Sequence, residues 1–242
     1  MLQKRRPRNK PLYKKFIRLR ENVQYRRKLV KFKKRKWRPL LIYLKRLSKR
    51  RKKNFRTYDL NKYLVRKFNN NYKNRFRYNT ILKKRFKLFY GGLLEKQIKT
   101  IVKKVLNKQN NIIKQLTSRN YLFLEFLEKR LDLILYRAHF AHSVYTARQF
   151  ISHGHITVNG KIERNHSFLL KQGDIIKINK KAQPLIWENV ARSHIWPLPP
   201  KYINVNYKTL EIIFNGDIKN YNLSPYYTFW LDINSLIKVY RK

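Results

Sequence analysis

The sequence predicts an α+β protein: a mostly helical, strongly basic body that carries a small α/β module of two short helices and a small curled sheet. Leucine and isoleucine recur at helical spacing in several segments before residue 137. Turn residues instead separate short β-prone runs between residues 153 and 178. The charge is uneven, because residues 1–90 hold 36 of the 60 Lys and Arg but only two of the 12 Asp and Glu.

The formal net charge of +48 indicates a polyanionic partner. A free chain with so much like charge repels itself, and nucleic acid relieves that repulsion because each phosphate accepts a Lys or Arg. A membrane surface or an acidic protein would favour a compact basic patch rather than charge spread along the chain. No run of 18 apolar residues exists, so no membrane span is predicted, and the absence of cysteine excludes disulfides and thiolate metal sites.

Residues 1–38 mix basic runs with isolated aromatic side chains. Disordered tails are normally depleted in aromatics, so this composition favours an arm that becomes ordered on RNA over a solvated tail. Its rings would stack on exposed bases while its cations follow the phosphates. The Arg-rich start also resembles a mitochondrial transit peptide, but the same composition continues to about residue 90, and we expect mature protein.

Residues 39–124 are expected to form a basic helical region. Pro39 suits the first turn of a helix, and leucines follow at i, i+4 and i+7 from Leu40. Residues 54–90 have no clear period and are expected to form loops and short helices. A second helix is predicted over 94–105, with an interruption at 107–111, and a third over 121–137. We interpret their apolar faces as core.

The module that follows is predicted from its turn residues. Ser143 can cap a short helix, and Gly154 can end it. A strand over 155–158 leads into Asn159-Gly160, which is a strong hairpin signal, and 161–163 returns. Another strand is expected over 175–178. Further strands at 202–206 and 209–214 and a short helix over 232–240 complete the chain.

Residues 130–178 resemble the S-four RNA-binding domain. The landmarks are Arg-Leu-Asp at 130–132, Phe-Ala-His-Ser at 140–143, Ala-Arg-Gln-Phe-Ile at 147–151 and His-Gly-His-Ile-Thr-Val-Asn-Gly-Lys at 153–161. Upstream, Tyr-Gly-Gly at 90–92 and Glu-Lys-Gln at 95–97 resemble the motif before this domain in small-subunit ribosomal protein S-four. The tail from residue 200 resembles that family's closing segment, whereas residues 1–89 match only in being basic.

The chain departs from the family pattern in several places. Val144 stands where an Arg commonly follows the serine, and His166-Ser167-Phe168 replaces Pro-Ser-Tyr. The zinc knuckle of some bacterial members is impossible without cysteine. We interpret residues 182–200 as an insertion or connector.

The resemblance implies a structural constituent of the small ribosomal subunit that binds its ribosomal RNA (rRNA), nucleates assembly and catalyses nothing. Implied partners are this rRNA, neighbouring ribosomal proteins and messenger RNA near its entry path, with no membrane and no cofactor. The Asn-, Lys- and Ile-rich composition fits an AT-rich organellar gene, in a mitochondrion by preference and a plastid as alternative. The expected divisions are a basic RNA-associated arm (1–38), a helical rRNA-binding region (39–124), the S-four domain (125–180), and a connector and tail packing back on the helical body (181–242).

RNA contacts are expected from donors near the helix N-termini and in the loop 153–161. They are Arg130, Arg137, His142, Ser143, Arg148, Gln149, His153, His155, Asn159, Lys161 and Ser167. Arg148 is expected on the exposed side of its helix, and Lys161 at the rim of the same surface. By charge alone, both would be ordinary solvated side chains.

Three alternatives concern chemistry. The histidines between 139 and 166 invite a metal, but structural zinc needs four ligands and acids are sparse, so no metal site is expected. A pseudouridine synthase type of enzyme would use the Asp of Arg-Leu-Asp, but too few residues follow the module for a catalytic domain, and Asp132 is interpreted as a helix-surface ion-pair partner. A small RNA chaperone would need little beyond the module.

Overall fold

The structure is a computed structural model of the chain. It describes residues 18–19, 23, 38–53, 72–111, 119–195, 198–216, 218, 227 and 231–241. These residues fall into two compact units, one within Met1–Phe89 and Leu223–Val239, the other within Tyr90–Asn222 and Tyr240–Lys242. Most of the arm expected at 1–38 therefore lies outside the described residues, as does the stretch 54–71.

The first unit contains α2 (Arg38–Lys53), α3 (Tyr72–Phe89) and most of α9 (Ile233–Arg241). Helix α2 begins next to Pro39, as predicted. Helix α3 is a single 18-residue helix, so the prediction of loops and short helices is wrong there. Its buried Leu82, Phe86 and Phe89 do follow helical spacing. The pattern is obscured because Phe76, earlier in the helix, is 63% exposed.

The second unit begins with α4 (Glu95–Asn111), α5 (Arg119–Glu128), α6 (Leu131–Arg137) and α7 (Val144–Ser152). Helix α4 continues through 107–111, where an interruption was predicted. The single helix predicted over 121–137 is two helices. Arg130 is extended between them and forms a bridge with Leu169, in which Leu131 N donates to Phe168 O at 2.9 Å. This pairing with a distant segment breaks the helix.

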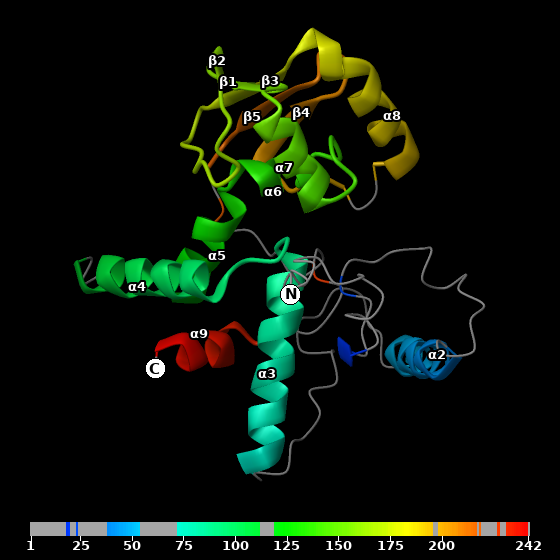
Figure 1. The fold of residues 1–242 in the computed structure, drawn as a ribbon, viewed down its shortest axis with the longest axis vertical. Coiled ribbons are helices and arrows are strands. Elements are labelled where there is room, and N and C mark those ends of the chain that lie inside the picture. Colours follow the sequence, from blue (N-terminus) through cyan, green and yellow to red (C-terminus); the bar gives the residue numbers. More distant parts are fainter. Residues whose placement is uncertain are drawn as a thin grey trace, which may run out of the picture. The chain divides into compact units, whose positions relative to one another are not determined.

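A five-stranded antiparallel sheet follows, in the order β2-β1-β3-β5-β4 (Figure 1). Its strands are β1 (Ile156–Val158), β2 (Lys161–Ile162), β3 (Ile175–Ile178), β4 (Ile203–Asn206) and β5 (Glu211–Phe214). Asn159 and Gly160 have φ values of 50° and 81°, and this pair of positive angles is typical of the predicted hairpin turn. The strand predictions are therefore confirmed to within two residues.

The C-terminal strands extend the sheet of the module. β5 pairs with β3, with Ile213 opposite Ile175, and β4 pairs with β5. The expectation that residues 181–242 pack back on the helical body is thus wrong for β4 and β5, although most of α9 groups with the first unit. Much of the supposed connector is helix α8 (Gln183–Ser193), which follows the short 3-10 helix η4 (Lys180–Ala182).

The core of the second unit lies between one face of the sheet and helices α6 and α7. Ile156, Ile176 and Ile212 alternate with exposed or partly exposed neighbours and are fully buried. Ala147 and Ile151 of α7 are also fully buried. This packing fixes which face of α7 remains open to solvent. Among the described helices, none is long and apolar enough to cross a bilayer.

Candidate nucleic-acid interface

A buried carboxylate holds two arginines at the start of the module. Asp132 is fully buried, and its two oxygens accept hydrogen bonds from Arg130 Nε and Nη2 at 3.1 and 2.9 Å. Arg148 Nε donates to Asp132 Oδ2 at 2.8 Å. Because α6 carries Asp132 and α7 carries Arg148, this cluster joins the two helices.

Arg148 also holds the loop before α4. Its guanidinium donates to the carbonyl oxygens of Gly91 and, at 3.2 Å, of Tyr90. Gly91 has a φ of 69°, and a Cβ there would lie 2.6 Å from Val144 Cγ1 and 2.9 Å from Arg148 Nη2. Only glycine fits both the backbone conformation and the space. The Tyr-Gly-Gly motif is therefore shaped to receive this guanidinium.

These contacts correct two expectations. Arg148 does not lie on the exposed side of α7, because its side chain is 19% exposed and all three guanidinium nitrogens donate to protein oxygens. Asp132 is an ion-pair partner, but it is buried rather than at the helix surface. The sequence reasoning failed because the partners lie 16 and 57 residues from Arg148.

A second buried carboxylate receives four hydrogen bonds. Glu128, fully buried at the end of α5, accepts from Arg137 Nε at 3.1 Å and Nη2 at 2.9 Å. Tyr90 Oη donates to it at 3.0 Å and Tyr202 Oη at 2.9 Å. Burial alone would lower the pKa of Arg137, but the attraction of Glu128 and the adjacent tyrosines outweighs it and raises that pKa. Arg137 is thus charged, and its guanidinium is bound inside the protein.

The polar residues of the turns also form hydrogen bonds within the protein. Ser143 caps α7, its Oγ accepting from Thr146 N at 3.2 Å, as predicted. The Asn159 amide donates to Asp174 Oδ1 and accepts from Ile175 N, both at 2.9 Å, so it fixes the hairpin. Ser167 is half-buried, and its hydroxyl lies 3.1 Å from His166 Nδ1. These residues shape the loops that the exposed donors occupy.

His166 lies between the loop and the Asp132 cluster. Its Nδ1 is 4.0 Å from Asp132 Oδ2, and its side chain is 42% exposed. Burial and the nearby Arg148 charge lower the pKa of His166, and Asp132 only partly opposes them. The imidazole therefore favours the neutral form.

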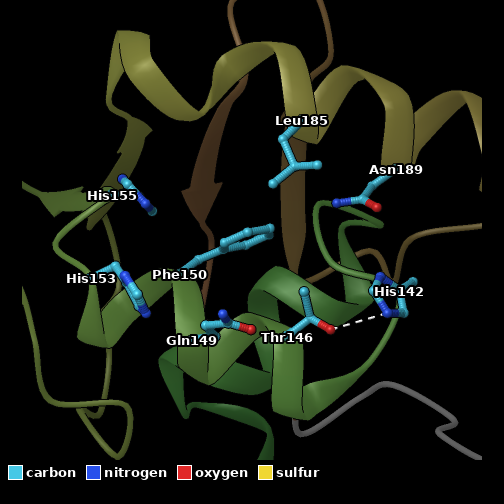
Figure 2. A pocket seen from close by; sticks show the side chains of 8 residues that line it. All are labelled: His142, Thr146, Gln149, Phe150, His153, His155, Leu185 and Asn189. Carbon is cyan, nitrogen blue, oxygen red and sulfur yellow. Dashed lines mark hydrogen bonds between the residues drawn. The ribbon is translucent and has the colours of Figure 1, made fainter.

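The donors left open to solvent form a smaller set than expected. His142, Gln149 and His153 are exposed along α7 and its ends, and Lys161 is exposed beside the hairpin turn. His155 is half-buried, and its ring stacks on that of His153 at 5.9 Å with an angle of 15°. Figure 2 shows Gln149 and the three histidines with Phe150 around one hollow. The open face of α7 with the hairpin is the candidate interface.

This arrangement has consequences for the chemical alternatives. Within the described residues, no group of three His, Cys, Asp or Glu side chains could hold a metal ion. A catalytic aspartate must reach its substrate, whereas Asp132 is enclosed by two guanidinium groups. The exposed imidazole, amide and ammonium groups are of the kind that contact phosphates and 2′-hydroxyls.

Sequence reasoning missed Glu128, Tyr90 and Tyr202 as one group. A signal for Glu128 was present: three of the 12 acids of this chain fall at 125, 128 and 132, next to arginines. Scarce acids gathered beside arginines are typical of structural ion pairs. Tyr202 carried no local signal, because it lies 74 residues from Glu128.

Comparisons with known proteins identify the domain and its relatives. The S4 domain family matches residues 129–176. Small ribosomal subunit protein uS4 of Pelagibacter ubique is 37% identical over 132 residues, 54% of this chain and 61% of that protein, and uS4 of Caulobacter vibrioides is 38% identical over 134 residues, again 54% and 61%. The chain thus spans less than two thirds of these bacterial relatives.

A mitochondrial-type relative matches a larger part. Small ribosomal subunit protein uS4m of Reclinomonas americana is 33% identical over 191 residues, which cover 74% of this chain and 72% of that protein. In this chain, the match extends well beyond the residues that match the S4 domain family. The chain belongs to the uS4 family of small ribosomal subunit proteins.

Proposed function

We propose that this chain is a structural constituent of the small ribosomal subunit that binds small-subunit rRNA and supports its assembly. The observation that carries the proposal is the 33% identity to a small ribosomal subunit protein over 72% of its length. The net charge of +48 supports the same conclusion, because rRNA supplies the neutralising phosphates.

The proposed contacts within the S4 domain are the exposed donors. His142, Gln149, His153 and Lys161 lie open to solvent, and His155 is partly open. Asn159 and Ser167 are exposed and half-buried, respectively, and can add contacts, whereas the buried Ser143 acts by capping α7. Arg130, Arg137 and Arg148 act on RNA only indirectly, by holding α5, α6 and α7 in place.

The roles of the separate regions of the chain are also proposed. Residues 1–38 would form an RNA-associated arm, and 39–124 a helical rRNA-binding region. The 125–180 domain would bind with the open face of α7, while β4 and β5 extend its sheet. Neighbouring ribosomal proteins and messenger RNA near its entry path are the further partners proposed.

A mitochondrion is the proposed compartment, with a plastid as the alternative. The uS4m relative supports it, because its match covers more of this chain than the bacterial matches do. Purified mitochondria of the source organism should yield a small subunit that contains this chain. Finding it only in plastid ribosomes would reject the mitochondrial assignment.

The binding proposal is tested by titrating the full chain with its small-subunit rRNA at several salt concentrations. A site that engages about 8 phosphates should give a slope of log affinity against log salt of roughly −6, using the single-strand coefficient. A slope near zero would exclude phosphate-dominated binding. Loss of an rRNA uridine isomerisation in Asp132→Asn, with binding intact, would favour the enzyme alternative.

A further inference from the structure

A hollow lies between α7 and α8 in the second unit. Its volume is about 230 Å³. Eight residues line it, shown in Figure 2: His142, Thr146, Gln149, Phe150, His153, His155, Leu185 and Asn189. Helix α7 supplies one wall, and Leu185 and Asn189 of α8 form the opposite wall.

The lining combines flat or apolar surfaces with polar groups at the edge. Phe150 and Leu185 point toward each other across the hollow, and most of the lining surface is apolar. The stacked rings of His153 and His155 stand at one end, at an interplanar angle of 15°. A flat aromatic ligand in this space would gain apolar contact with Phe150 on one side and Leu185 on the other.

Two amides could contact the edge of such a ligand. The Gln149 side chain is exposed and forms no hydrogen bond with the described residues. Asn189 is 7% exposed, and its Nδ2 is held by Phe140 O at 3.2 Å, which fixes the orientation of the amide. Amides that both donate and accept suit the mixed edge of a nucleobase.

A backbone hydrogen bond joins the start of η4 to the histidine end of the hollow. Asn179 N donates to His155 O at 2.9 Å, and the exposed Lys180 and Lys181 follow immediately in η4. Lysines at this place suit the phosphates that flank a ligand base. The hollow thus offers apolar surfaces for the ring of a base and amides for the edge of that base. The nearby lysines would suit the phosphates of the same RNA strand.

We infer that the hollow between α7 and α8 binds one unpaired nucleobase of the small-subunit rRNA. The inference rests on the proposed function and deepens it, since it names the α8 wall and a single base as the ligand. Stacking of a base on protein rings depends little on which base it is. The hollow would therefore recognise a nucleotide by its flipped or bulged position in the rRNA rather than by its sequence.

The test fills the hollow without changing charge. Leu185→Trp places a bulky ring at a half-exposed position on the α8 wall. Ala191→Trp is the matched control, because Ala191 is exposed on the same helix and does not line the hollow. Full-length proteins are titrated with the small-subunit rRNA transcript, and unpaired bases are probed with dimethyl sulfate and carbodiimide.

The wild type should protect at least one unpaired base. Leu185→Trp should restore its reactivity and weaken binding about 5- to 150-fold, the range that corresponds to stacking of one base. Ala191→Trp should behave like the wild type. Gln149→Leu, at an exposed position that packing does not need, should weaken binding roughly 2- to 10-fold and decides the matter if Leu185→Trp unfolds.

The outcomes separate this inference from the proposed function. Failure of the wild type to bind rRNA at all would refute the proposed function. Wild-type binding with Leu185→Trp and Gln149→Leu unchanged in affinity and protections would refute only the base site, and would assign the hollow to a side chain of a neighbouring protein. Equal losses in Leu185→Trp and Ala191→Trp would refute it too.

Discussion

The S4 domain holds two groups of cationic and polar side chains in opposite surroundings. Arg130 and Arg137 are 4% and 5% exposed and pair with fully buried carboxylates. Gln149, His153 and Lys161 lie within the same stretch of sequence but are open to solvent. The sequence suggested one role for both groups, namely RNA contact, whereas the structure divides them.

This difference shows how a domain that is proposed to bind RNA can also use arginine in its own interior. A buried guanidinium is costly to desolvate unless it is paired and fully hydrogen-bonded. Glu128 and Asp132 meet that condition with several hydrogen bonds each. The two acids thereby tie α5, α6, α7 and the loop at residues 90–92 into one support for the exposed face.

Loss of Glu128 should have the largest effect on stability. Glu128→Gln leaves Arg137 buried without a counter-charge and weakens the bonds from Tyr90 and Tyr202. We expect the free energy of unfolding to fall by roughly 3–5 kcal/mol. Urea unfolding followed by circular dichroism measures it. Glu188→Gln is the control, since this exposed pair with Arg192 should change stability by less than about 1 kcal/mol.

Asp132→Asn should have a smaller effect. The remaining amide oxygen can still accept from one arginine, and Arg148 keeps the carbonyls of Tyr90 and Gly91. The loss should be about 1.5–3 kcal/mol, the contribution of a hydrogen bond to a charged group. The same unfolding experiment measures it, and a loss larger than that of Glu128→Gln would reverse the proposed ranking of the two clusters.

The smallest effect concerns pH. The pKa of His166 is lowered in the folded protein, so protonation favours the unfolded chain. Stability should therefore be fully present above the ordinary value of 6.5 and should decrease as the pH falls through the folded pKa. His166→Gln should flatten the dependence of the unfolding free energy on pH in this window. An unchanged dependence would show that burial and the nearby arginines do not lower the pKa of His166 in the folded protein.

The local features were readable from the sequence. The Ser143 cap, the Asn159-Gly160 turn and the strand at 175–178 depend on residues within a few positions of one another. Pairing between distant segments could not be predicted from the sequence. The bridge between Arg130 and Leu169 breaks a helix that its own apolar spacing predicted to be continuous.

At the candidate site, too, the sequence predicted local features but not contacts between distant residues. The exposure of Lys161 followed from the turn beside it. The burial of Arg148 depended on a glycine 57 residues away and on an aspartate of another helix. Helix α8, which forms a wall of the base-sized hollow, lay in a stretch interpreted as a connector because it resembled no part of the family motif.

The most direct measurement of the division between the two groups is a pair of charge reversals with two readouts. Arg148→Glu places a carboxylate beside Asp132 and should lower the free energy of unfolding by about 3–5 kcal/mol. Lys161→Glu should leave it within about 0.5 kcal/mol, because the side chain is exposed, yet should weaken rRNA binding about tenfold or more. If Arg148→Glu unfolds like the wild type and only loses rRNA affinity, Arg148 faces RNA and the structural role assigned to it is contradicted.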